Sequence, residues 1–142
     1  MASSTTSNYL FNKSMGHILK GQDFTPPTVL YVGLFTTVPQ LNGAGGTEVS
    51  TSGTSYARVP IQQNTGWQGP SGVNQEYSNA SDIAFQVPSG NWGTIQGCGI
   101  YDAQEGGNLL WVGYLTTSKS VTSGDGAPKI LANALKISRA TC

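Results

Sequence analysis

The sequence predicts a mainly β protein, an antiparallel β-sandwich of the jelly-roll type with one short N-terminal α-helix. Glycine and proline are frequent, with 19 Gly and 7 Pro among 142 residues, and both interrupt helices and mark turns. After residue 25 the chain alternates between runs of β-branched and aromatic side chains and Gly-rich segments. That pattern predicts about seven or eight strands with a turn about every 8–12 residues, as in a sandwich.

The N-terminal part divides into an arm and a helix. Residues 1–7 are polar and small, which predicts a flexible N-terminal arm, and residues 8–142 are long enough for a single β-sandwich domain. Ser7 is a plausible N-cap and Gly21 a plausible C-terminal cap. Between them the spacing predicts a helix over 8–20, with apolar side chains at Leu10, Phe11, Met15, Ile18 and Leu19.

The first half of the β region combines one strongly apolar strand with two long Gly-rich segments. Residues 28–37 are apolar on both faces, which predicts a strand covered on both sides. Residues 39–54 form a loop long enough to suggest a functional or partner-bound role. A short strand over 56–61 contains Pro60, which favours a sheet edge, and 64–72 is a second Gly-rich excursion.

The second half reads as shorter strands joined by turns. Gly97 and Gly99 leave one of these strands without a side chain at two positions, which indicates that another backbone or a large ring lies against it. Strands are expected at 82–87, 94–103, 108–117, from Val121 and at 135–140, with turns at 77–81, 88–93, 104–107 and 124–128.

The charge content is low and balanced. Seven basic and seven acidic residues give a formal net charge of zero, and charged residues make up 10% of the chain, against about 25% in ordinary domains. Nucleic-acid binders need clustered Lys and Arg, so we expect no nucleic-acid partner. We also expect no membrane partner, because no apolar run approaches ~18 residues and residues 1–8 lack a signal peptide's apolar core. We therefore expect the chain to be made in the cytoplasm without a secretion signal.

The residues needed for catalysis are scarce, so we expect no enzyme activity, cofactor or metal. His17 is the one histidine, which leaves no partner for a nucleophile relay and too few ligands for zinc. Its expected place is the surface of the helix. Asp102 and Glu105 lie in a turn that could attract calcium, but a hydrogen bond from Asp102 to its own turn is the favoured interpretation.

A few aromatic and charged residues are candidates for a partner interface. Trp67 is the strongest of them, because indoles are enriched at interface hot spots. Tyr56, Arg58 and Glu48 lie around the long loop; we expect Arg58 either to pair with Glu48 across the loop base or to dock to a partner. The other two tryptophans are expected inside the fold, Trp111 in the core and Trp92 at one end of the sandwich.

The two cysteines do not form a disulfide scaffold in a chain of this length. Cys98 lies in an apolar run, which predicts a buried, inert thiol. Cys142 is the last residue and is a candidate for an inter-subunit disulfide; a bridge between Cys142 and Cys98 is the other possibility.

Four segments in order, about residues 8–125, carry a family resemblance. They read NYLFNKSMGHILKG, TVLYVGLFTTVP, GTEVSTSGTSYARV and NWGTIQGCGIYDAQEGGNLLWVGYLTTSKSV, the last followed by GD at 124–125. This order resembles a family of small tailed-bacteriophage virion proteins, often labelled phage tail fibre or minor structural proteins. The chain differs from that pattern in the insertion TSGTS before Tyr56 and in the terminal Cys142. The resemblance implies a structural, non-enzymatic component of the virion.

Two positions in the virion remain open. A compact unit with a polar arm and long loops, and without a shaft, favours a capsid decoration (cement) protein on the capsid surface. It would bind the major capsid protein through the arm and loops and act through many copies, as a homo-oligomer with a trimer favoured. The alternative is a tail, neck or baseplate appendage of the tail-fibre type that binds the host surface through Trp67 and the 39–54 loop.

Overall fold

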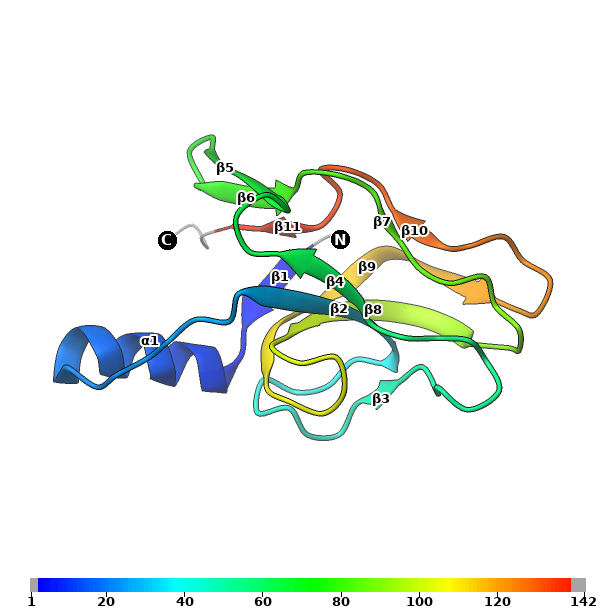
Figure 1. Cartoon of the computed structure of the whole chain (residues 1–142), viewed down its shortest axis with the longest axis horizontal. Coiled ribbons are helices and arrows are strands. Elements are labelled where there is room, and N and C mark those ends of the chain that lie inside the picture. Colours follow the sequence, from blue (N-terminus) through cyan, green and yellow to red (C-terminus); the bar gives the residue numbers. More distant parts are fainter. Residues whose placement is uncertain (1–2, 139–142) are drawn as a thin grey trace.

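The structure is a computed structural model that describes residues 3–138. It is mainly β with antiparallel pairing and one helix (Figure 1), which confirms the predicted fold class. The largest sheet has the order β1-β9-β8-β2-β3, and β4 also pairs with β2. Its strands are β1 (Ser3–Thr6), β2 (Val29–Thr37), β3 (Thr47–Glu48), β4 (Val59–Gln62), β8 (Gly93–Tyr101) and β9 (Leu109–Val121).

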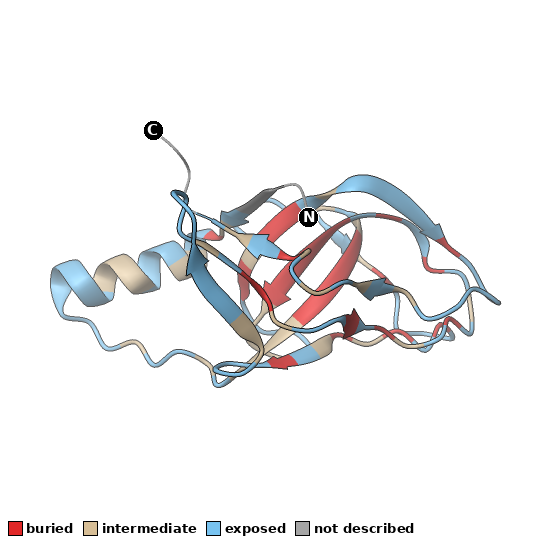
Figure 2. Ribbon diagram, turned by 90° about the horizontal axis from the view of Figure 1, so that it is seen from above, coloured by how far each residue is buried: buried red, intermediate tan, exposed pale blue. Residues whose placement is uncertain are grey.

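Two small sheets lie over one face of the large sheet (Figure 1). One pairs β7 (Ile83–Ala84) with β10 (Lys129–Ile130); the other has the order β11-β6-β5, from β5 (Trp67–Ser71), β6 (Glu76–Asn79) and β11 (Lys136–Ile137). The main hydrophobic core lies between these layers, where Val32 and Ile100 of the large sheet belong to one cluster with Ile83, Phe85 and Leu135. Figure 2 shows this buried centre and the exposed outer strands.

The predicted strand over 28–37 is β2, and both of its faces are covered. Four consecutive residues, 32–35, are buried. Val32 and Leu34 belong to the main core, whereas Phe35 packs with Leu109 and Val112 in a second cluster. Such a run without alternation is expected where both sides of a strand exclude water.

The glycines of β8 permit the close contact that the sequence predicts. A Cβ atom on Gly99 would lie 2.7 Å from a ring carbon of Phe35, and one on Gly97 would lie 2.5 Å from the carbonyl oxygen of Gly113. Both distances are too short for a side chain, so a large ring and a neighbouring backbone do lie against this strand, as predicted.

The helix α1 (Asn8–Lys20) has the predicted bounds and caps. Ser7 accepts a hydrogen bond from the Leu10 backbone N–H at 3.2 Å, and its hydroxyl donates to the carbonyl of Leu109. Gly21 adopts the left-handed conformation with φ 64° and ends the helix, a conformation that glycine adopts without steric cost. No residue of α1 is buried, so its apolar side chains do not belong to the core.

Part of the predicted flexible arm is ordered in the structure. Ser3–Thr6 form β1 and pair with residues 111–114 of β9, so for these four residues the expectation of a flexible arm was wrong. Strand pairing uses backbone groups and needs no apolar side chain, and β9 would otherwise expose an unpaired edge. The division into an arm and a single domain over 8–142 stays a prediction.

The Gly-rich excursion over 64–72 was also expected without regular structure, as was the turn over 77–81. In the structure β5 and β6 form a hairpin across these segments, with Trp67 opposite Asn79. Local composition hides this pairing because the partner strand supplies the backbone hydrogen bonds.

Several strand ends differ from the prediction. Only Ile83–Ala84 of the predicted strand 82–87 forms a strand, and Val87 is exposed. The segments predicted at 108–117 and from Val121 are one continuous strand, β9. The closing strand contains only Lys136–Ile137 within the described residues. Pro60 does lie on a strand at the sheet edge, because within residues 3–138 β4 pairs with β2 alone. No helix within 3–138 is long and apolar enough to cross a membrane.

Candidate functional site

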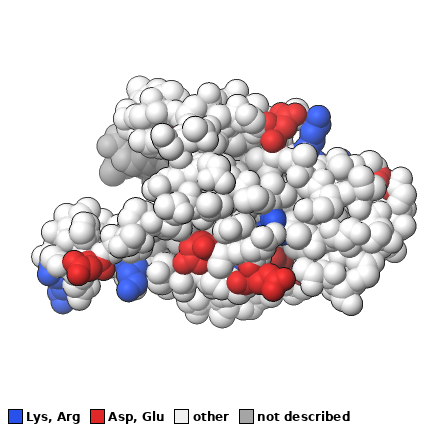
Figure 3. Space-filling view, viewed as in Figure 1, with Lys and Arg blue, Asp and Glu red and all other residues white. Residues whose placement is uncertain are grey.

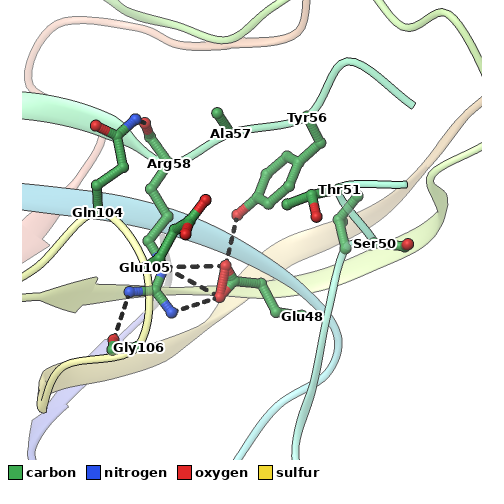
Figure 4. A pocket seen from close by; sticks show the side chains of 10 residues that line it. Glu48, Ser50, Thr51, Tyr56, Ala57, Arg58, Gln104, Glu105 and Gly106 are labelled. Atoms are coloured by element: carbon green, nitrogen blue, oxygen red, sulfur yellow. Dashed lines mark hydrogen bonds and ion pairs between the residues drawn. The ribbon is translucent and has the colours of Figure 1, made fainter. Parts of the chain in front are cut away.

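A cleft of about 580 Å³ opens between the long 39–54 loop and the turn that joins β8 to β9 (Figure 4). Its wall includes Glu48, Tyr56 and Arg58, three of the four predicted interface residues. The 39–54 loop and the β8–β9 turn are about 50 residues apart in sequence, and the large sheet brings them together because β3 and β8 both pair with β2.

The centre of the cleft wall is an ion pair between Arg58 and Glu48. The Arg58 Nε donates to both Glu48 carboxylate oxygens at 3.1 and 3.0 Å, and Nη2 donates to Oε1 at 2.8 Å. Arg58 is 8% exposed and Glu48 is 23% exposed. The structure therefore contains the pairing that the sequence suggested, and the alternative of Arg58 docking to a partner stays a prediction.

The same guanidinium also holds the β8–β9 turn. Arg58 Nη1 donates to the carbonyl of Ala103 at 2.9 Å and to that of Gly106 at 2.8 Å, and the guanidinium lies 3.5 Å from the ring centre of Tyr101. Burial by itself would lower the pKa of Arg58, but the hydrogen bonds and charge of Glu48 outweigh it and raise the pKa. Arg58 is therefore a permanent cation that fastens two loops to the sheet.

Tyr56 is the third member of this network and belongs to the buried core. Its hydroxyl accepts a hydrogen bond from the Leu34 backbone N–H at 2.8 Å and donates to Glu48 Oε2 at 3.2 Å. Burial, followed by the negative charge of Glu48, raises the pKa of Tyr56 far above its usual range. The phenol therefore stays neutral and is a fixed donor to the carboxylate rather than an acid or base for chemistry.

The outer rim of the cleft is polar and exposed. Ser50 and Thr51 come from the long loop, and Gln104 and Glu105 come from the β8–β9 turn. Hydroxyl, amide and carboxylate groups of this kind form hydrogen bonds with a polar surface. The hydrogen-bonded residues of the cleft wall thus fix the shape of the cleft, whereas the exposed residues of the rim are the ones that a partner can contact.

Trp67, the fourth predicted interface residue, lies elsewhere. It is half-buried, packs against the main core and lines an apolar groove with Tyr77 and Trp111. Its Nε1 is buried and has no hydrogen-bond partner among the described residues. The structure thus separates Trp67 from the Arg58 network, and its role at an interface stays a prediction.

The other residues singled out in the sequence have structural contacts. Trp92 is buried, and its Nε1 donates to the carbonyl of Thr54 at 2.9 Å. Trp111 is half-buried and packs against the core. Asp102 accepts hydrogen bonds from the backbone and side chain of Asn108, as the turn interpretation predicts. His17 is exposed on α1, with Nδ1 2.8 Å from the carbonyl oxygen of Gln22.

Sequence reasoning missed Asn79, which is 1% exposed. Its side-chain amide donates to the carbonyls of Ser81 and Leu131 at 2.7 and 3.0 Å, and its side-chain oxygen accepts from the Leu135 N–H at 2.9 Å. Asn79 therefore joins segments more than 50 residues apart. An Asn in a polar segment is typical of a turn, so nothing local indicates its burial.

Cys98 is fully buried, as predicted, and burial raises the pKa of its thiol to about 12. We expect Cys98 of a Cys142→Ser variant to react with a thiol reagent in urea but not in the native state. In the unfolded chain the thiol ionises near pH 9. Burial of the neutral thiol therefore contributes fully to the stability of the fold below pH 9, and this contribution is lost as the pH rises towards 12. Rapid native labelling at neutral pH would contradict the assignment. Cys142 lies outside the described residues.

The charged side chains on the face shown in Figure 3 are scattered, with no continuous basic patch. Within 3–138, no group of three or more His, Cys, Asp or Glu residues is placed to hold a metal ion.

Comparison with known proteins identifies a family relationship. Residues 5–138 match the family model described as "Podophage GP4 fiber I protein gp80". No curated protein matches the chain significantly.

Proposed function

The chain belongs to this family of phage fibre proteins, and from that membership we propose that it is a structural, non-enzymatic component of the tail fibres of a podophage. The observation that carries the proposal is the extent of the match, residues 5–138. That range includes both small sheets, the cleft and the helix, so the family relationship concerns the whole fold rather than one appended module.

The family description favours the tail appendage, the alternative of the sequence analysis, over the capsid decoration protein. The hypothesis of a capsid decoration protein relied on a polar arm that becomes ordered on contact with a capsid. Ser3–Thr6 of that arm are already paired with β9 in the isolated chain, which removes part of the support for that function. A place on the capsid surface is therefore the second choice.

The cleft network supports a mechanical role. The polar groups of Arg58, Glu48 and Tyr56 form hydrogen bonds with one another. They also bind three backbone groups, the N–H of Leu34 and the carbonyls of Ala103 and Gly106. A general acid, base or nucleophile needs a group that can exchange a proton or attack a substrate, and these three side chains are committed to holding loops. The network keeps two loops in one arrangement, which suits a building unit of a larger particle.

Imaging of virions tests this proposal. Gold-labelled antibody fragments raised against the purified protein should bind at the tail when virions of the encoding phage are examined by electron microscopy. Virions of a deletion mutant are the control for specificity. Label confined to the capsid surface would overturn the tail assignment and support a decoration protein, and absence of label from intact and disrupted particles would overturn a structural role in the virion.

A further inference from the structure

The helix α1 exposes an apolar face that no described part of the chain covers. Phe11 is 56% exposed, Ile18 70% and Leu19 75%, and they lie on one side of the helix together with the half-buried Met15. The helix extends from one end of the body in Figure 1 and again in the perpendicular view of Figure 2. Large apolar side chains gathered on one exposed face are typical of an interaction surface.

The segment that follows the helix returns along another side. The side-chain oxygen of Gln22 occupies the space where a Cβ atom of Gly16 would lie, and the backbone carbonyl oxygen of Gln22 is 2.8 Å from His17 Nδ1. At 100° per residue, Gly16 and His17 lie well away from the direction of Phe11, Met15 and Ile18. The contacts of the returning segment therefore leave the apolar face open.

An isolated helix of this length gains little stability on its own. Helices shorter than about 12–15 residues are marginal in water, and α1 has 13 residues, none of them buried. Gly16 in its interior costs about another 1 kcal/mol relative to alanine. Packing of the apolar face against a partner would supply the missing stabilisation.

We propose that this face binds the same face of a second copy of the chain, so that α1 helices pair between subunits. Phe11, Met15 and Ile18 are spaced by four and then three residues, which is the d–a–d spacing of a coiled-coil seam. In that register Lys13 and Lys20 both fall at position f, the side farthest from the partner.

The charge distribution favours a copy of the chain over an acidic partner. The flanking e and g positions are Asn12, Ser14 and Leu19, none of which is charged. Two copies can therefore approach without repulsion between like charges, whereas an acidic groove would find no lysine at the border of the seam. The inference deepens the proposed function, because a fibre requires contacts between its subunits.

The seam is short, so the association is expected to be weak outside the particle. A helix of 13 residues is about 20 Å long, and three seam residues bury less than the roughly 800 Å² per partner of a standard interface. Attachment of several copies to one particle raises their effective concentration and strengthens such a contact.

Analytical ultracentrifugation of the purified chain tests the pairing. The wild type should associate as its concentration rises, and Ile18→Glu should weaken association at least about a hundredfold because it places an unpaired charge in the seam. Lys20→Glu on the opposite face is the matched control and should associate like the wild type. Near-UV circular dichroism should be unchanged in both variants, since neither side chain contacts the core.

Crosslinking provides a more sensitive measurement for weak association. In a Cys142→Ser background, Met15→Cys at the centre of the seam should form disulfide-linked dimers on mild oxidation, and Lys20→Cys should not. Equal crosslinking of the two variants, or none in either, would overturn the proposal. So would a wild type that stays monomeric but binds anionic phospholipid vesicles through Ile18, which would make α1 a membrane-binding helix. These assays use purified protein, so their outcome is independent of where the protein lies in the virion.

Discussion

Trp92→Ala is expected to lower the free energy of unfolding by about 4 kcal/mol, near the middle of the range for buried large aromatic residues. Trp92 is 4% exposed and packs edge-on against Tyr56 and Phe85, with ring centres 5.3 and 6.5 Å away. Its loss leaves a cavity in the main core and removes the buried hydrogen bond to the Thr54 carbonyl. Urea unfolding followed by circular dichroism measures the change, because the fluorescence of the variant itself is altered.

Trp92→Phe separates the packing from the hydrogen bond. Phenylalanine keeps an aromatic ring in the core but cannot donate to Thr54, so we expect a loss of about 2 kcal/mol, from an unsatisfied buried carbonyl and a smaller ring. Val87→Ala, at an exposed position, should change stability by less than about 0.5 kcal/mol. A Trp92→Ala variant as stable as this surface control would show that Trp92 does not belong to the core.

The elements predicted well from the sequence are those whose signals are local. Ser7 and Gly21 set the ends of α1 because capping depends on the residue itself and its nearest backbone neighbours. The strand β2 was evident from its continuous apolar run, and the close contact at Gly99 from the absence of a side chain in a strand. In each case the physical cause lies within a few residues of the observation.

The elements that were missed depend on a distant partner. Ser3–Thr6 have no strand signal of their own and are ordered by the edge of β9, more than 100 residues later. The hairpin of β5 and β6 lies in a segment whose glycines and proline indicate a turn. The same limit applies to the exposed face of α1, since helical spacing predicts that a face exists but not what covers it.

The candidate site was predicted in part. The scarcity of charges made Arg58 and Glu48 natural partners, and they do form an ion pair. Tyr56 was selected for its position after the long loop, not for its bond to the carboxylate. The contribution of the β8–β9 turn, through the Ala103 and Gly106 carbonyls, could not be foreseen because backbone acceptors carry no sequence signature.

Arg58→Ala is expected to lower the free energy of unfolding by about 3 kcal/mol. Breaking a fully buried ion pair costs about 3–5 kcal/mol because the remaining charge is uncompensated, and the low end applies here because Glu48 is 23% exposed and can be partly rehydrated. The variant also loses two hydrogen bonds to the β8–β9 turn and the contact with the Tyr101 ring. Urea unfolding measures the global effect, and faster hydrogen exchange in 102–108 and around Glu48 should report the local one.

The double variant Arg58→Ala/Glu48→Gln identifies the origin of that loss. If an uncompensated carboxylate is the main cost, neutralising Glu48 should recover about 1 kcal/mol relative to Arg58→Ala alone, although Glu48→Gln by itself destabilises the protein. Arg58→Lys keeps the charge but cannot reproduce the planar set of donors that reaches the carboxylate and both carbonyls, so it should remain destabilised. Additive effects of the two single substitutions would mean that Arg58 acts chiefly through the turn carbonyls and the Tyr101 ring. In that case the network would hold the β8–β9 turn, and the 39–54 loop would depend on its own contacts.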